Sequence, residues 1–419
     1  MNTRYPTGSF GDIADINPQQ SSKKWQGRSI HYIDISSVGT GKFLSEPEKM
    51  LYDEAPSRAR RVVKEGDILI STVRPNRKSI IRLESVSENT LVSTGFAVIR
   101  PKIPSDSHYI FSVCMSEDFT KKLSKLMNGA AYPSVSVEDI LDVEIPIPEL
   151  NIRSRIAKIA ENMDYYISLL RQRATLIEGR ISGIYQSLFV RFEPVKCNLI
   201  GEKSIYVGEK NAELFPSSFV DSEIGEIPTG WQVTKIGEIA SERKENIDVN
   251  EMKPEMVYIG LEHMPRKSMS ITDWGCAVEL ASGKRKFSTG EILFGKLRPN
   301  LHKVGFCPIN GICSTDIIVI NSIDENDRNL LLCIVSSGKF VKEMTSLSSG
   351  TRMPRVKWDD IKDYKIAIPD KQLRAYFQQK TDPYVELLQS NIFELMHIEE
   401  MRKTILHRLL IGKLTLSAN

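Results

Sequence analysis

The chain repeats part of its own sequence at an offset of 221 residues. Residues 129–148 and 350–369 share glycine, proline, aspartate and isoleucine at matching places, for example Gly129 with Gly350, Pro133 with Pro354, and Asp139 with Asp360. Self-similarity on this scale indicates a duplicated module. Two similar but unequal modules present two related surfaces, which suits a bipartite target. The repeat therefore points to binding before it points to catalysis.

The duplication extends toward the start of each half. Matching segments are Phe10–Ala14 with Ile236–Ala240, Gly66–Leu69 with Gly290–Leu293, Arg74–Asn76 with Arg298–Asn300, and Ser93–Thr94 with Ser314–Thr315. The offset falls from 226 through 224 to 221 along these matches. Loops tolerate such length changes more readily than strands do. The halves are therefore predicted to share one fold.

Each half combines strand and helix patterns. Gly66–Val73, Thr94–Pro101 and Asp316–Ile320 are predicted strands, because β-branched residues follow turn residues in each. Apolar residues recur at helical spacing over Ser107–Leu126 and Asp327–Leu347, which predicts one helix in each half. The predicted fold class is α+β, with two similar globules of about 150 residues.

A long helix is predicted after the first globule. Apolar residues alternate in steps of four and three at Ile156, Ala160, Met163, Ile167, Leu170, Ala174, Ile177, Ile181, Ile184 and Leu188. A sustained heptad seam is typical of a coiled coil. The alternative is a helix buried in a globular core, which requires a wider apolar stripe.

The equivalent seam after the second globule is less uniformly apolar. It comprises Phe377, Thr381, Tyr384, Leu388, Asn391, Leu395, Ile398, Arg402, Ile405 and Leu409. A single seam asparagine can fix register and partner, but the seam could instead rotate onto Ile392 and leave Asn391 solvated. Because proline disrupts a helix interior, the straight helix is predicted to start near Asp382, with Pro383 in its first turn.

These patterns predict five segments. They are a globule at 1–149, a central helix at 150–192, a polar connector at 193–229, a second globule at 230–370 and a C-terminal helix at 371–419.

Composition excludes few functions, but it bears on the class of partner and on the cellular compartment. The 419 residues carry 56 Lys and Arg against 53 Asp and Glu, a net charge of +3, so a nucleic-acid footprint must come from local clustering. The six cysteines show no CxxC spacing, which argues against a disulfide framework or a structural zinc site. With no signal-peptide pattern and no apolar run of membrane-spanning length, a cytoplasmic protein with no membrane partner is expected.

Taken together, the order of segments resembles a known family. The alternation of two globules and two long helices, the stretch Gly225–Trp231 that enters the second globule, and Ile145–Pro148 before the first helix are similar to specificity subunits of type I restriction-modification enzymes. This likeness covers nearly the whole chain. It implies that the globules are target recognition domains, each reading one half of a split DNA sequence. It also implies that the helices form an antiparallel coiled coil that acts as a ruler, with a pseudo-twofold internal repeat.

The same resemblance implies the partners. Expected are double-stranded DNA, two methyltransferase subunits held by the helices and adjoining globule surfaces, and motor-nuclease subunits attached to those. The chain itself is then non-catalytic and carries no cofactor. S-adenosylmethionine, ATP and Mg are expected on the partner subunits.

Residues that would contact DNA are sought among basic and amide side chains in equivalent loops. Arginine can bind guanine and asparagine adenine through paired hydrogen bonds, although Arg-Pro-Asn could equally be a structural turn. The predicted contacts are Arg74, Asn76, Arg77, Lys78, Tyr132, Ser134, Lys284, Arg285, Arg298, Asn300, His302, Lys303, Arg352 and Arg355. Of these, the run Lys284–Lys286 is a candidate for phosphate contacts or a plain solvated face. The two halves differ at three aligned positions, where the first has Tyr132, Ser134 and Ser136 and the second has Met353, Arg355 and Lys357. Specificity is predicted to lie where the halves differ.

Enzyme alternatives find little support in the residues. Gly290–Leu297 resembles a phosphate-binding loop but has leucine where Ser or Thr must hold Mg²⁺. Asp382-Pro383-Tyr384 lacks one proline of an adenine methyltransferase motif, and Asp360 with Lys362 has no convincing acidic partner for a nuclease. The six histidines form no ligand spacing. The remaining rival is a non-catalytic scaffold whose two modules bind protein instead of DNA.

Overall fold

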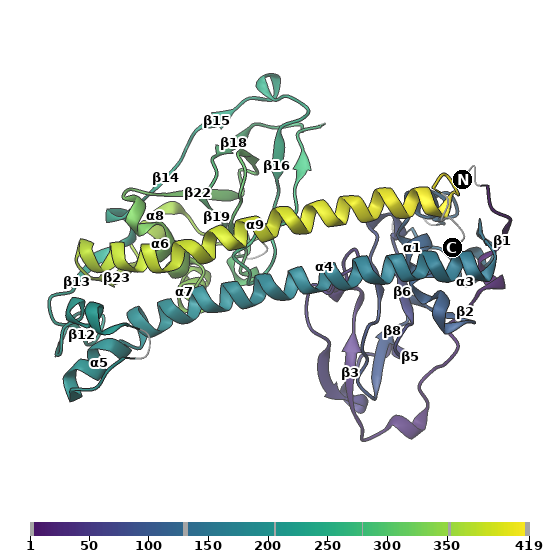
Figure 1. Ribbon diagram of the computed structural model, residues 1–419, viewed down its shortest axis with the longest axis horizontal. Helices are drawn as coiled ribbons and strands as arrows, with labels where there is room; N and C mark the ends of the chain where they lie inside the picture. The colour runs from purple at the N-terminus through teal and green to yellow at the C-terminus, as the bar shows by residue number, and fades with distance from the viewer. Residues whose placement is uncertain (1–3, 129–132, 205–206, 279, 351–352, 415–419) are drawn as a thin grey trace. The chain divides into compact units, whose positions relative to one another are not determined.

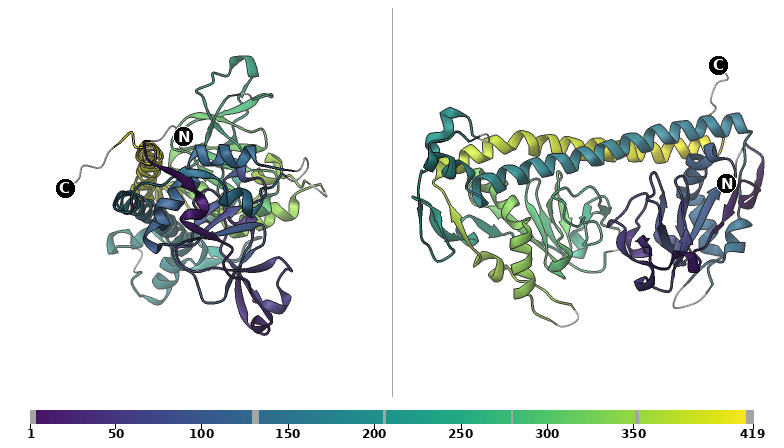
Figure 2. Two further views of the ribbon diagram at one scale, coloured as in Figure 1. Left: turned by 90° about the vertical axis from the view of Figure 1, so that its right-hand side faces the viewer. Right: turned by 90° about the horizontal axis from the view of Figure 1, so that it is seen from below.

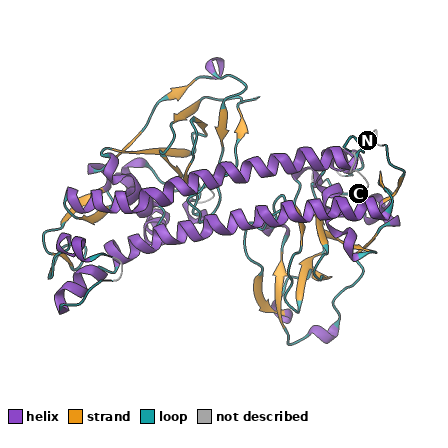
Figure 3. Cartoon of the chain, viewed as in Figure 1, coloured by secondary structure: helices purple, strands orange, loops and turns teal. Residues whose placement is uncertain are grey.

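The computed structural model describes residues 4–128, 133–204, 207–278, 280–350 and 353–414 (Figure 1). The chain divides into two compact units. The first unit comprises Met1–Ser168 and His397–Asn419, and the second comprises Leu169–Met396. Each of the two long helices, α4 (Leu150–Tyr185) and α9 (Lys371–Leu410), therefore contributes one part to each unit. Strands and helices occur in both units (Figure 3).

Among its described residues, the first unit contains two four-stranded sheets and a two-stranded one. Its strands are β1 (Thr7–Ser9), β2 (Ala14–Ile16), β3 (Ser29–Ile33), β4 (Glu48–Leu51), β5 (Ala59–Val62), β6 (Ile68–Ser71), β7 (Ile80–Arg82), β8 (Thr90–Ser93), β9 (Phe96–Pro101) and β10 (Glu144–Pro146). The sheet orders are β2-β9-β6-β7, β4-β3-β8-β5 and β1-β10. Helices α1 (Ser107–Met115), α2 (Glu117–Lys125) and α3 (Val137–Leu141) accompany them.

The second unit repeats this arrangement and adds to it. Its strands are β11 (Phe219–Val220), β12 (Ile227–Pro228), β13 (Gln232–Lys235), β14 (Ala240–Glu242), β15 (Asn246–Ile247), β16 (Val257–Ile259), β17 (Gly275–Cys276), β18 (Lys284–Phe287), β19 (Ile292–Gly295), β20 (Val304–Phe306), β21 (Gly311–Cys313), β22 (Ile317–Ser322) and β23 (Lys365–Ile368). Its helices are α5 (Glu193–Ile200), α6 (Arg328–Val335), α7 (Gly338–Leu347) and α8 (Trp358–Lys362), besides its parts of α4 and α9.

The duplicated fold follows from the matching strand orders and registers. The sheet β14-β22-β19-β20 corresponds strand by strand to β2-β9-β6-β7. In the first, Ile292 faces Ile320, and in the second Ile68 faces Ile99. Strands β3 and β8 run parallel, as do β16 and β21. The prediction that both halves share one α+β fold is confirmed, and so are the three predicted strands, now β6, β9 and β22.

Central strands are apolar on both faces. All four residues of β6 and of β19 are buried, because each strand has a hydrophobic core on both of its faces. Ile68 and Ile70 pack into one core and Leu69 into another, and Ile292, Phe294 and Leu293 divide in the same way. The near-match to a phosphate-binding loop at Gly290–Leu297 is thereby explained as a strand, since its apolar centre forms β19.

The single helices predicted in each half are wrong in one respect: each is two helices. Helix α2 starts after Ser116, whose hydroxyl accepts a hydrogen bond from the Phe119 amide, and α7 starts after Ser337, which caps Phe340 in the same way. A serine cap supplies an acceptor to a new helix end, so the chain turns there. The apolar residues keep their helical spacing across the break, so the sequence pattern does not indicate that one helix ends and another begins.

The connector is also more ordered than its polar composition predicts. Helix α5 lies within it, and the buried side chains of Val195, Val207, Phe215 and Ile227 belong to the main core of the second unit. Phe219 of the connector meets Phe192 edge-on at 6.0 Å between ring centres. The connector is therefore part of this unit.

Helix α9 begins at Lys371 and continues through Pro383, so the predicted start near Asp382 is wrong. Tertiary contacts hold the segment before the proline. Phe377 and Thr381 are fully buried, and Asn329 donates to the Thr381 hydroxyl over 2.9 Å and to Asp382 over 3.0 Å. Pro383 itself is exposed, so the carbonyl that loses its amide donor can bind water.

Within each unit, parts of α4 and α9 pack side by side in opposite directions (Figures 1 and 2). In the second unit, Asn391 donates to the Leu170 carbonyl over 3.0 Å. Phe189, in the short π-helix Gln186–Val190 that continues α4, meets Phe377 at 5.0 Å between ring centres. In the first unit, Arg402 binds Asp164, and Ile156 shares a core with Leu406 and Leu409. Rising numbers on α4 thus meet falling numbers on α9 in both units.

Most predicted seam residues lie in these interfaces. On α4 the buried members are Ile156, Ala160, Ile167, Leu170, Ile177, Ile181 and Ile184, whereas Met163 and Ala174 are half-buried. Leu188 is buried in the one-turn π-helix Gln186–Val190 that follows α4. On α9 they are Phe377, Thr381, Leu388, Asn391, Leu395, Arg402 and Leu409, and Tyr384, Ile398 and Ile405 are half-buried. Asn391 is 0% exposed, so the solvated alternative is wrong, although Ile392 is buried too. The Asn391 amide is satisfied by the Leu170 carbonyl and by Arg173.

A buried ion pair recurs in the two units. Arg153 in the first turn of α4 lies 2.9 Å from Asp106, which precedes α1. At the same repeat positions, Arg374 in the first turn of α9 binds Asp327, which precedes α6. Asp106 is 0% exposed and Asp327 is 1% exposed. Each globule is thus joined to the first turn of a long helix by a buried charge pair.

Candidate nucleic-acid interface

The two Arg-Pro-Asn sequences form the same turn. In the first unit, the short helix Pro75–Arg77 lies between Arg74 and Lys78, whose φ angles are 50° and 51°. In the second unit, Pro299–Leu301 lies between Arg298 and His302, at 51° and 52°. A left-handed backbone at a residue other than glycine costs on the order of 1 kcal/mol. Four such residues at equivalent positions show that both units maintain this turn against strain.

Each turn is attached to the second predicted cluster. The Arg74 amide donates to the Pro133 carbonyl and the Arg298 amide donates to the Pro354 carbonyl, both over 2.8 Å. Next to these bonds, Val73 pairs with Ser134, and Leu297 pairs with Arg355. The structure therefore brings together segments separated by more than fifty residues in each unit. Tyr132 and Arg352 lie outside the described residues.

Some side chains of the turns serve to fasten them. Lys78 forms a 2.6 Å ion pair with Glu117 of α2. In the second unit, the His302 ring lies 2.9 Å from the Ser336 carbonyl oxygen, and burial lowers the pKa of His302. The Lys303 amine donates to the Leu261 carbonyl, and burial lowers its pKa as well. The neutral form of His302 is thus favoured, and these residues are less available to a ligand than their sequence pattern predicts.

The tips of the turns are exposed. Pro75 and Pro299 are buried and anchor the turns, whereas Asn76, Arg77, Arg298 and Asn300 are exposed. Asn76 and Asn300 thus occupy equivalent positions on rigid turns. Such presentation suits contact with a flat or grooved partner surface.

Lys284 does not fit the predicted exposed basic run. It is 6% exposed, and its amine donates to Ser282 and lies 5.8 Å from the Tyr258 ring centre. Strand alternation does not account for this burial, because Lys284 and Lys286 lie on the same face of β18 and the Lys286 side chain is 41% exposed. Lys284 is buried by its own contacts with Ser282 and the Tyr258 ring. The prediction that Lys284 faces solvent is therefore wrong.

The neighbours of Lys284 are engaged by carboxylates. Arg285 pairs with Glu242, and Lys286 lies 2.7 Å from Glu245. Hydrogen bonds from Lys286 and Arg243 lower the pKa of Glu245 to about 2. These charges are partly neutralised within the protein.

A basic concavity of about 750 Å³ adjoins the Arg298 turn in the second unit. Its cationic lining residues are Lys244, Arg285, Lys296, Arg355 and Lys357, against two acids, Glu242 and Asp359. Burial lowers the pKa of Lys296, and the nearby charges of Arg285 and Arg355 lower it further, against the opposing charge of Asp316. Arg355 forms a 3.1 Å ion pair with Asp316. The concavity therefore concentrates positive charge.

Lys244 and Lys296 were not predicted as site residues, and Lys357 appeared only as a position where the halves differ. The three lie more than fifty residues apart in sequence, so no charge run marks them. Only an alignment of the two halves, which sets them against Pro18, Thr72 and Ser136, contains the signal.

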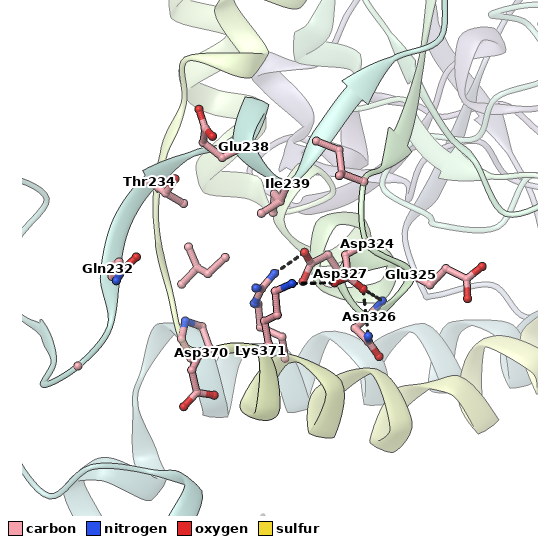
Figure 4. Close-up of a pocket in the computed structure, with 15 residues that line it drawn as sticks. Gln232, Thr234, Glu238, Ile239, Asp324, Glu325, Asn326, Asp327, Asp370 and Lys371 are labelled. Atoms are coloured by element: carbon pink, nitrogen blue, oxygen red, sulfur yellow. Dashed lines mark hydrogen bonds and ion pairs between the residues drawn. The ribbon is translucent and has the colours of Figure 1, made fainter.

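A second cavity in this unit has the opposite charge. About 730 Å³ in volume, it is lined by Glu238, Asp324, Glu325, Asp327 and Asp370 together with Lys371 and Arg374 (Figure 4). Arg374 forms an ion pair with Asp327, and the Lys371 amine lies 3.9 Å from Asp324. Burial raises the pKa of Asp327, although Arg374 opposes the rise. An acid-rich lining is unsuited to phosphate.

The proposed nuclease pair is accounted for by helix capping. The Asp360 carboxylate accepts from the Lys357 amide over 2.8 Å, as Asp139 does from Ser136 over 2.9 Å. Lys362 pairs with Asp359 instead. Within the described ranges, no three His, Cys, Asp or Glu side chains gather in a way that could hold a metal ion. Nor is any helix in that part of the chain both long and apolar enough to cross a bilayer.

Comparison with known proteins gives a consistent result. The family model described as "Type I restriction modification DNA specificity domain" matches twice, over residues 5–179 and 228–392. The MjaIX specificity subunit of a type I restriction enzyme from Methanocaldococcus jannaschii is 22% identical over 97% of this chain and 91% of its own length. The HindI specificity subunit from Haemophilus influenzae is 23% identical over 92% and 94%.

A solved structure shares the fold. The S subunit of a type I restriction-modification system from M. genitalium superimposes with a TM-score of 0.52, at 13% identity, over 99% of this chain and 98% of that one.

Proposed function

Because this chain belongs to the type I restriction modification DNA specificity family, as the double match of its family model shows, we propose that each unit reads one half of a split DNA sequence. DNA target recognition is the activity of this family, and catalysis lies in partner subunits of such systems.

One observation supports the proposal most directly: the two units have the same turn, at Arg74 and Arg298, but different residues beside it. Both units present an exposed asparagine on the same strained turn, and both fasten that turn to the segment after Pro133 or Pro354. At the next position the first unit has Ser134 and the second has Arg355. Identical turns give the two units one way of docking on a duplex, whereas different neighbours give them different base preferences.

The test replaces the turn in one unit. Arg298→Ala with Asn300→Ala should change or abolish recognition of one half of the target and leave assembly with the methyltransferase subunits intact. Arg74→Ala with Asn76→Ala is the matched variant and should affect the other half. The readout is a map of methylated adenines in a host that carries the whole system. Unaltered methylation sites in both variants would exclude the turns as readers.

The long helices are proposed to set the spacer between the half-sites. Support comes from α4 and α9, which pair within each unit and each belong to both units. An α-helix advances about 1.5 Å per residue, so its length converts directly into distance.

The same helices and adjoining globule surfaces are proposed to hold two methyltransferase subunits, to which motor-nuclease subunits attach. S-adenosylmethionine, ATP and Mg would then be bound by those partners. A scaffold that binds only protein is the rival function. It predicts no salt-sensitive shift of random duplexes by the chain with its methyltransferase partner.

A further inference from the structure

The two units differ in charge at the basic concavity of the second unit. Repeat alignment sets Lys244, Lys296, Arg355 and Lys357 against Pro18, Thr72, Ser134 and Ser136. Every cation in this set is thus replaced by a neutral residue in the first unit. Equivalence does not rest on the alignment alone, since the strand registers and helix caps agree with it.

Three structural correspondences establish that equivalence. Gly295, before Lys296, faces Ile317 as Ser71, before Thr72, faces Phe96. Leu297 pairs with Arg355 as Val73 pairs with Ser134. Lys357 precedes α8 at its N-cap, as Ser136 precedes α3.

The fifth cation of the concavity, Arg285, corresponds to an arginine of the first unit that makes different contacts. Arg285 faces Cys313 in its sheet, and the equivalent Arg61 faces Val92. Arg61 is turned to Asn17 and to the Phe96 carbonyl, and burial lowers its pKa. Arg285 instead lines the concavity, where Glu242 balances it.

The cations of the concavity are held close to one another without enough acid to balance them. Glu242 forms ion pairs with both Arg285 and Lys244, the latter at 3.6 Å. Asp316 forms an ion pair with Arg355. Among the described residues, no ion pair joins Lys296 or Lys357 to an acid. Mutual repulsion of this kind is relieved by a bound anion.

We propose that this concavity binds backbone phosphates of the DNA duplex, and that the first unit has no equivalent phosphate site. The inference rests on the proposed DNA recognition and adds an asymmetry to it. Arg355 connects the concavity to the reading turn, because its strand partner Leu297 directly precedes Arg298. A phosphate held there would fix the register of Arg298 and Asn300 on the bases. In the first unit, the turn tip carries the exposed Arg77, at the position where the second unit has Leu301.

The experiment measures the salt dependence of DNA binding. The full chain with its methyltransferase subunits is titrated onto a labelled random-sequence duplex at 50 to 200 mM KCl. The same titration is made with a variant that combines Lys296→Gln and Lys357→Gln. Each lost phosphate contact reduces the slope of log K against log salt by about 0.9, so the pair should reduce it by about 1.8. The fall in affinity across this fourfold salt range should then be about 12-fold smaller than for the unsubstituted chain.

Three further variants separate charge from structure. Lys296→Arg with Lys357→Arg keeps the charges and should keep the original slope. Lys253→Gln with Lys371→Gln removes two exposed lysines that do not line the concavity and should also keep it. In the first unit, Thr72→Val, at the position equivalent to Lys296, should leave the slope unchanged.

The outcomes are distinguishable. An unchanged slope in the glutamine pair at the concavity would overturn the phosphate site while leaving DNA recognition in place. An equal loss of slope in the first-unit variant would overturn the asymmetry. Absence of any salt-dependent binding by the unsubstituted complex would overturn the proposed function as well.

Discussion

Removing Arg374 from the buried ion pair of the second unit should strongly destabilise that unit. The Asp327 carboxylate is 1% exposed and pairs with Arg374, and its other oxygen accepts no hydrogen bond from any described residue. Arg374→Met keeps much of the side-chain volume but leaves this carboxylate without its cation. Breaking a buried pair in this way typically costs about 3–5 kcal/mol, because the remaining charge is uncompensated. In a unit of this size, such a loss lowers the Tm by roughly 6–20 °C.

The loss should depend on pH in a defined direction. Burial raises the pKa of Asp327 in the folded chain, and Arg374 opposes that rise, so Arg374→Met raises the pKa further. A carboxyl group whose folded pKa is raised favours the protonated form. Its penalty is absent below the unfolded pKa of about 3.9 and grows as the pH rises through the folded pKa. The deficit should therefore be larger at pH 8 than near pH 5.

The assay is thermal unfolding of the full chain at several pH values, followed by circular dichroism. Asp327→Leu combined with Arg374→Met removes both charges and should be more stable than Arg374→Met alone, since a well-packed apolar pair can replace a buried ion pair. Lys371→Met is the control, because this residue of the same helical turn is 84% exposed in its side chain. A double variant as unstable as the single one, or a deficit that does not change with pH, would refute the reasoning.

Two further perturbations address the long helices. Insertion of seven residues after Ser168, with seven more after Met396, preserves the heptad seam and the pairing within each unit, and should lengthen the methylated spacer by about 3 base pairs, since a heptad adds about 10 Å and a base pair spans about 3.4 Å. Methylation mapping measures this, and an unchanged spacer would contradict the ruler. Pro383→Ala should raise the free energy of unfolding by about 1–3 kcal/mol, because it restores an amide donor at an exposed helical position. Denaturant titration tests it, and a less stable variant would show that the proline is required.

The elements that were predictable are those whose signal is local or repeated. Periodic apolar residues located α4, and β-branched runs located β6, β9 and β22. The offset between the halves predicted two copies of one fold, which the matching strand orders confirm. Errors arose where the pattern continued across a structural break, as at Ser116 and Ser337, or where a local rule was overridden by packing, as at Pro383.

The candidate site was predictable in its parts and not as a whole. Arg298, Asn300 and Arg355 were recognised as residues of two separate clusters, and their proximity depends on the backbone bond from Arg298 to Pro354. Lys284 belongs to a run of basic residues, but contacts with Ser282 and the Tyr258 ring bury it, and the order of residues does not specify those contacts. His302 and Lys303 have the expected chemistry, but their polar atoms bind backbone carbonyls within the unit.

By itself, the sequence determined the duplication, the heptad seams and the positions at which the two halves differ, because these are properties of residue order. Only the tertiary structure decided which charges are available. Strand pairing gathers Lys244, Lys296 and Lys357 into one concavity and buries Lys284, while the pairing of α4 with α9 gives Asn391 the Leu170 carbonyl that makes its burial tolerable. The electrostatic worth of a side chain is set by its distance to other groups and its contact with water, and the order of residues specifies neither.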